Sequence, residues 1–153
     1  MQGWQESCQD LKNSKLKAWV MDAASTCAKL PSLQVELVRV AKTDEAKHSW
    51  LRETKLSLND NLWMLAYAEL KSDSATILAD FVSNKPLGSW LFAANSDWRR
   101  SSFLYKIDKI DSISTDVLLA AAIVARRSEF LHKSNAKIIL TEVFLEHPFW
   151  EDK

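Results

Sequence analysis

STDVLLAAAIVARRSEFLHKS, residues 114–134, is the segment from which the expected fold follows. Its middle, residues 117–125, consists of nine consecutive apolar residues. A helix that is apolar on every side must be covered by other elements, because none of its faces can meet water. Ser114 or Thr115 can cap such a helix, and Asp116 places a carboxylate at the end that the helix dipole favours. The segment therefore predicts a buried central helix over residues 116–132.

The scarcity of glycine and proline extends this expectation to the whole chain. The sequence holds two glycines and three prolines, whereas the many turns of a sandwich or barrel favour both residue types. Its 153 residues suit one domain with a substantial core. We expect an all-α fold, a single helical domain over residues 1–153, built as an irregular or orthogonal bundle of about seven to nine short helices around the central helix.

Three shorter segments carry local signals. The apolar spacing slips by one position near Asn13-Ser14, which predicts a kink or a new helix capped by Ser14. Asp73-Ser74 is expected to cap an amphipathic helix whose apolar side holds Ile77, Leu78, Phe81 and Val82. At the other end of the chain, Phe149 and Trp150 place two large aromatic side chains close to the C-terminus. Because such side chains are usually tied down, we expect this tail to fold back onto the domain.

Composition excludes several classes of function. Lysine plus arginine equals aspartate plus glutamate at 20 each, so no overall field attracts nucleic acid or an anionic membrane. Cys8 and Cys27 lack the spacing of a zinc site, and no other metal site or cofactor is expected. The N-terminus lacks the features of a secretory signal, and the apolar run is less than half of the about 20 residues that span a bilayer. These features predict a soluble cytoplasmic protein.

The seven tryptophans are more than a core of this size obviously needs, so some are expected at a contact surface. Aromatic and arginine side chains alternate in the segment after residue 90, and such a mixture suits the anchoring of a protein partner. The residues predicted to bind a partner are Phe92, Trp98, Arg99, Arg100 and Tyr105.

No pattern of residues indicates catalysis strongly, so the first hypothesis for function is a non-enzymatic protein. It would bind another macromolecule, most plausibly a protein, as an adaptor, an inhibitor or an immunity-type factor. Nucleic acid is not an expected partner of such a chain, because its formal charge is neutral.

The alternative hypothesis is enzymatic. Arg127 and His132 are separated by four residues, and this Arg-x4-His spacing resembles the motif of the HEPN superfamily of small all-helical domains. The resemblance implies a homodimeric, metal-independent ribonuclease in which two Arg/His pairs meet. In that chemistry the arginine would hold the scissile phosphate, and the imidazole would act as acid or base.

Two Glu-x-x-His pairs, Glu45 with His48 and Glu129 with His132, have the spacing that places both side chains on one helix face. Bundle proteins with two metal ions use such pairs. However, Glu45 and His48 fall on a wholly polar stripe that is expected to face water, so no metal site is predicted.

Overall fold

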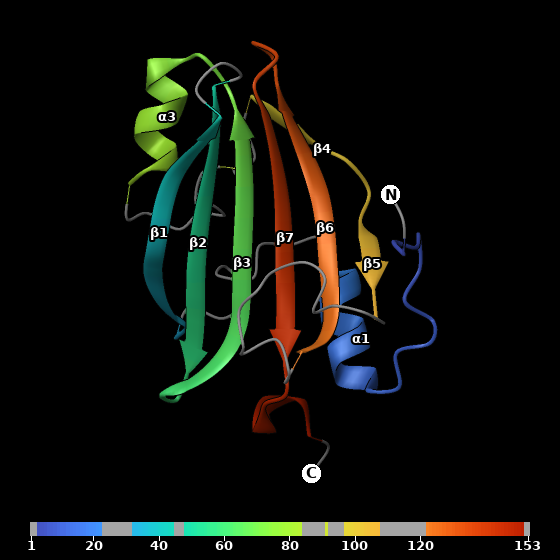
Figure 1. The fold of residues 1–153 in the computed structure, drawn as a ribbon. Helices are drawn as coiled ribbons and strands as arrows, with labels where there is room; N and C mark the ends of the chain where they lie inside the picture. Colours follow the sequence, from blue (N-terminus) through green and yellow to red (C-terminus); the bar gives the residue numbers. More distant parts are fainter. Residues whose placement is uncertain are drawn as a thin grey trace.

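The computed structural model of the chain is mainly an antiparallel β-sheet, and the predicted all-α bundle is wrong (Figure 1). The structure describes residues 3–22, 32–44, 48–83, 91, 97–107 and 122–151, and all structural statements below concern these residues. The predicted contact residue Phe92 and residues 117–121 of the apolar run lie outside them.

Seven strands form one sheet in the order β1-β2-β3-β7-β6-β4, and β5 also pairs with β6. The strands are β1 (Gln34–Asp44), β2 (Ser49–Leu58), β3 (Asn61–Lys71), β4 (Trp98–Arg100), β5 (Leu104–Lys106), β6 (Ala122–His132) and β7 (Lys137–Leu145). The helices are α1 (Ser14–Met21) and α3 (Ala75–Phe81), with a short 3₁₀ helix at Pro148–Trp150. Helix α1 lies near one end of the strands and α3 near the other (Figure 1).

The segment predicted as a central helix contains strand β6, whose residues run through the middle of the sheet. Val124 and Ala125 point to opposite faces of this strand, and both are fully buried. A strand covered on both faces shows an uninterrupted apolar run, which periodicity alone does not distinguish from a buried helix.

The tight turns of the sheet explain why few glycines are needed. Asn59 and Asp60 join β2 to β3 with φ angles of 52° and 64°, and Asn135 has a φ of 73° between β6 and β7. His48, just before β2, has a φ of 50°. Asparagine, aspartate and histidine tolerate this left-handed region better than other side chains. They occupy turn positions where glycine is common, so a glycine-poor sequence still forms hairpins.

Both helices pack on the same face of the sheet. Leu16 and Val20 of α1 join an apolar cluster that contains Trp63 and Phe144, whereas α3 contributes to a second cluster near the other end of the strands. The second cluster consists of Ala68, Leu70, Ile77, Phe81, Leu91, Phe130, Ala136, Ile138 and Leu140. A smaller cluster, built on Leu65 and Val143, lies on the opposite face.

Of the local predictions, the helix start near Ser14 is confirmed but its cap is wrong, because the Asn13 side chain caps α1. The predicted cap at Ser74 is confirmed in α3. The C-terminal aromatic pair folds back: Trp150 is buried, and its ring stacks on Trp63 with centroids 5.1 Å apart. Asn13 Nδ2 donates to the Trp150 carbonyl oxygen at 2.7 Å, which links the start of α1 to the tail.

The described tryptophans belong to the core or pack against it. None of the six that the structure describes is exposed. Trp19, Trp63 and Trp150 pack against one another, with ring centroids 5.1–5.7 Å apart. All six lie in or against the apolar clusters of the sheet, so the number of tryptophans alone does not indicate a contact surface. Neither described helix is long and apolar enough to cross a lipid bilayer.

Replacing Trp150 by alanine tests the aromatic cluster. Removing a buried indole leaves a cavity, so we expect the free energy of unfolding to fall by about 3–5 kcal/mol in urea titrations. The control is Val82→Ala, since Val82 is 40% exposed and should change stability little. Equal, small effects of the two substitutions would show that the tail does not pack on the sheet.

Candidate active site

A band of buried polar side chains crosses the helix-covered face of the sheet between its two apolar clusters. In β7, Glu142 stands between Phe144 of one cluster and Leu140 of the other. In β6, residues 126 and 128 stand between Val124 and Phe130 in the same way. We call this set the polar band; its members are Arg52, Thr54, Arg100, Arg126, Ser128 and Glu142.

The period of two along each strand and the pairing between strands bring these side chains together. Thr54, Ala66, Glu142 and Arg126 are consecutive partners across β2, β3, β7 and β6. Arg52, Ala68, Leu140 and Ser128 are partners in the next row on the same face. The β3 residues of both rows are alanines, so only methyl groups separate Arg52 from Glu142 in the sheet.

The centre of the polar band is an ion pair between Arg126 and Glu142. Arg126 Nε donates to Glu142 Oε1 at 2.9 Å, and Nη2 lies 2.7 Å from the same oxygen. The exposed fractions of the two side chains are 0% and 6%. Charges this deeply buried are tolerated only when each is paired and hydrogen-bonded.

Arg126 also joins the sheet to α1. Its Nη1 donates to the carbonyl oxygens of Val20 and Asp22, both at 3.0 Å. These carbonyls lie at the C-terminal end of α1, where helix carbonyls lack intrahelical partners and the dipole favours a cation. The guanidinium lies 4.3 Å from the ring centroid of Phe103 as well. One side chain thus connects two strands, a helix and an aromatic ring.

Two further arginines belong to the polar band. Arg52 is 1% exposed and donates from Nη2 to the Ser83 carbonyl oxygen at 3.2 Å, and its burial lowers the pKa of the guanidinium. The guanidinium of Arg100 lies 4.4 Å from the Phe103 ring centroid. Burial and the charge of Arg126 lower the pKa of Arg100, whereas the charge of Glu142 raises it.

The polar band therefore carries an excess of positive charge. Arginine stays protonated in proteins even when its pKa is lowered. Among the described residues, the polar band holds three guanidinium groups, of Arg52, Arg100 and Arg126, and one carboxylate, that of Glu142. Cations thus outnumber carboxylates within the polar band, in surroundings where each charge is strengthened by the lower dielectric. Such a site is suited to an anionic ligand.

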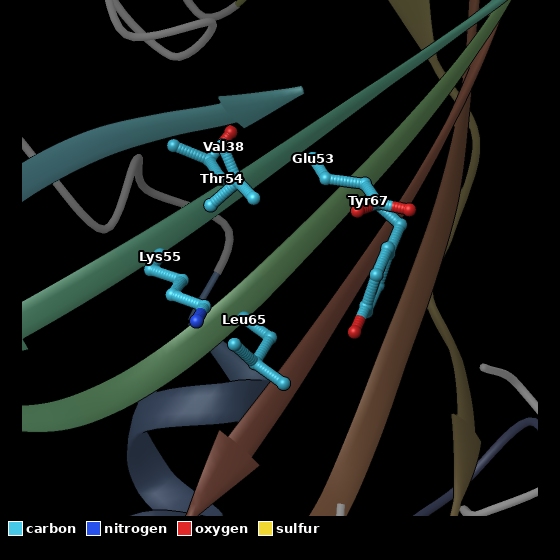
Figure 2. A pocket seen from close by; sticks show the side chains of 6 residues that line it. All are labelled: Val38, Glu53, Thr54, Lys55, Leu65 and Tyr67. Carbon is cyan, nitrogen blue, oxygen red and sulfur yellow. The ribbon is translucent and has the colours of Figure 1, made fainter. Parts of the chain in front are cut away.

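A shallow hollow elsewhere on the sheet is less suited to a charged ligand. Residues of β1, β2 and β3 line it: Val38, Glu53, Thr54, Lys55, Leu65 and Tyr67 (Figure 2). Its two charged groups, Glu53 and Lys55, have opposite signs, and Glu53 already accepts a hydrogen bond from Arg39 at 2.8 Å. It offers no unbalanced charge.

The described residues of the predicted contact surface do not share one face. Arg100 belongs to the polar band, but Arg99 is exposed and points to the opposite side of β4. Trp98 is partly buried beside His132, with ring centroids 4.9 Å apart. Tyr105 is a core residue whose hydroxyl donates to the Val20 carbonyl oxygen at 3.4 Å.

The predicted Arg127/His132 ribonuclease pair is not formed within the chain. The two residues are an odd number of positions apart on β6, so their side chains point to opposite faces. Arg127 stacks on Trp4, with its guanidinium 4.2 Å from the ring centroid, and donates to Thr141 Oγ1. His132 lies 2.7 Å from Ser134 Oγ, measured from Nδ1.

The same alternation separates Glu129 from His132, since the i, i+3 spacing unites side chains on a helix but not on a strand. Among the described residues, no cluster of three or more histidine, cysteine, aspartate or glutamate side chains could hold a metal ion.

Comparison with known families gives one match, to the model of the family described as chorismate lyase, over residues 29–153. The match covers most of the chain and every strand of the sheet. This chain belongs to the chorismate lyase family. A comparison with curated proteins gives no match. Because the chorismate lyase family is named for an enzyme, the expectations of a non-enzymatic binding protein and of a HEPN-like ribonuclease are both wrong.

Sequence reasoning missed Arg52, Arg126, Ser128 and Glu142, although a signal for one of them was present. In β2, buried residues alternate with partly exposed ones from Arg52 to Leu58. An alternation of this kind is typical of a half-buried strand, and it places Arg52 at a core position. An arginine at a core position is unusual enough to indicate function.

The Arg126–Glu142 pair gives a test of this site's energetics. Arg126→Met leaves the Glu142 carboxylate buried without its cation, so we expect a loss of about 3–5 kcal/mol in the free energy of unfolding. The double variant Arg126→Met/Glu142→Leu removes both charges and should recover most of that loss in urea titrations. If the double variant is as unstable as the single one, the pair does not behave as a buried ion pair.

Proposed function

We propose that this protein is a chorismate lyase, which removes the enolpyruvyl side chain of chorismate to give 4-hydroxybenzoate and pyruvate. In this elimination the C3–O and C4–H bonds of the ring break, and the ring becomes aromatic. The proton from C4 ends on the methylene carbon of the departing side chain, which becomes the methyl group of pyruvate. Atoms and charge balance without an oxidant or a reductant.

The observation that carries the proposal, beside the family membership, is the charge of the polar band. Chorismate has two carboxylates, one on the ring and one on the side chain, and both are ionised at neutral pH. The band presents three guanidinium groups and one carboxylate between two apolar clusters. A dianion with an unsaturated ring suits both the excess of guanidinium groups over carboxylates in the polar band and the apolar surroundings.

The order of strands suggests a role for each group. Arg52 on β2 is assigned to the ring carboxylate. Arg100 on β4, on the other side of β3, β7 and β6, is assigned to the side-chain carboxylate; its pKa is affected by the charge of Glu142. Glu142 is assigned to the ring hydroxyl, from which it accepts a hydrogen bond. When the C3–O bond breaks, negative charge grows on the side-chain oxygen, and a preorganised arginine lowers the energy of that state.

Incubation of the purified protein with chorismate tests the proposal. We expect equal amounts of 4-hydroxybenzoate and pyruvate, measured by chromatography and by a coupled assay for pyruvate. Glu142→Gln should lower kcat/KM by about 10–100-fold, because a charge-assisted hydrogen bond to the substrate hydroxyl is lost. If the wild-type protein forms neither product, the proposed function is wrong.

Neutralising the arginines tests the charge argument itself. Arg52→Met and Arg100→Met should each raise KM for chorismate by about 10-fold or more, since each removes one cation from a carboxylate. Arg39→Met is the matched control, because Arg39 is an exposed arginine of β1 that pairs with Glu53 at the surface. Its KM should stay at the wild-type value. Equal KM values for all three variants would contradict binding of a dianion at the polar band.

A further inference from the structure

The position of Ser128 in the polar band is not explained by the hydrogen bonds and ion pairs described above. It is 2% exposed, and its Oγ has no hydrogen-bond partner within the part of the chain that the structure describes. Burying a hydroxyl without a partner costs about 1–3 kcal/mol. An alanine at this position would avoid that cost and would fit the same space.

No described residue in its own row is a hydrogen-bond partner of Ser128. Its partner across the sheet is Leu140, the next residue in the row is Ala68, and Arg52 lies beyond them on β2. The polar residues nearer to it in the register are Arg126 on the same strand, Glu142 diagonally on β7 and Arg100 diagonally on β4. Arg126 and Glu142 are already engaged with each other.

We infer that Ser128 is a specificity-determining residue whose hydroxyl donates a hydrogen bond to the ring hydroxyl oxygen of the bound ligand. This inference rests on the proposed function. A ring hydroxyl that donates to Glu142 keeps lone pairs that can accept, and Ser128 stands diagonally beside Glu142 on the same face. Glu142 and Ser128 together satisfy the ring hydroxyl as donor and as acceptor.

The ligand orientation that follows agrees with the charges of the polar band. The ring hydroxyl of chorismate, and of its aromatic product, lies opposite the ring carboxylate. Glu142 and Ser128 lie on β7 and β6, and Arg52 lies on β2 with only Ala66 and Ala68 of β3 between. A ring lying over the two alanines places its hydroxyl at one side and its carboxylate at the other.

Two aromatic acids serve as probes: 4-hydroxybenzoate, and benzoate, which lacks only the ring hydroxyl. Dissociation constants are measured by isothermal titration for the wild-type protein and for Ser128→Ala. We expect the wild-type protein to prefer 4-hydroxybenzoate, and Ser128→Ala to lose about 5–10-fold of that preference while its affinity for benzoate stays unchanged. The free variant should also be more stable than wild type, because an unpartnered hydroxyl has been removed.

Ser57→Ala is the matched control, a serine of β2 whose side chain lies on the other face of the sheet, and it should leave the preference unchanged. Ser128→Thr keeps a hydroxyl and should restore part of the preference. The inference is overturned if Ser128→Ala binds the two acids with the wild-type ratio, or if its affinity for both falls equally. It is also overturned if the wild-type protein does not distinguish the acids.

The two hypotheses fail in different assays. If the wild-type protein cleaves chorismate but Ser128→Ala keeps the wild-type ligand preference, the proposed function stands and the inference about Ser128 is wrong. If the wild-type protein does not cleave chorismate but Ser128→Ala loses the preference for 4-hydroxybenzoate, the lyase activity is refuted and the role of Ser128 in binding the hydroxyl stands.

Discussion

The buried ion pair of Arg126 and Glu142 is the constraint on which the rest of the structure depends. Two charges inside an apolar face are tolerated only if they meet, so the pair fixes the register of β6 against β7. The same guanidinium binds the carbonyl oxygens at the end of α1, so the position of that helix is set by the same side chain. Strand register, helix placement and the geometry of the candidate site are therefore determined together.

The polar band also divides the core. On the helix-covered face, an apolar cluster lies on either side of it, one with α1 and the aromatic tail, the other with α3. A continuous apolar core would be more stable, because buried charges and an unpartnered serine hydroxyl cost free energy. Proteins depart from this rule mainly at functional sites. Family membership indicates an enzyme, and the buried charge indicates the polar band as the place of its site.

The sequence-based fold failed for two identifiable physical reasons. Val124 and Ala125, in the described part of the apolar run, are buried on opposite faces of β6, so the run has no period of two and resembles a buried helix. The left-handed turn positions are filled by Asn59, Asp60 and Asn135, so the count of glycines underestimates the number of tight turns. The predicted helix also underlies the Glu129/His132 pairing, because an i, i+3 spacing unites two side chains on a helix, whereas the strand sends them to opposite faces.

The sequence by itself determined the features that depend on neighbouring residues. These are the starts of α1 and α3, each set by a capping side chain within the segment, and the return of the aromatic tail to the core. Only the tertiary structure decided which residues share the polar band. Arg52, Arg126 and Glu142 lie on three strands, and hydrogen-bond register between strands distant in the chain places them on one face. That register is a property of the assembled sheet, and no local pattern of residues encodes it.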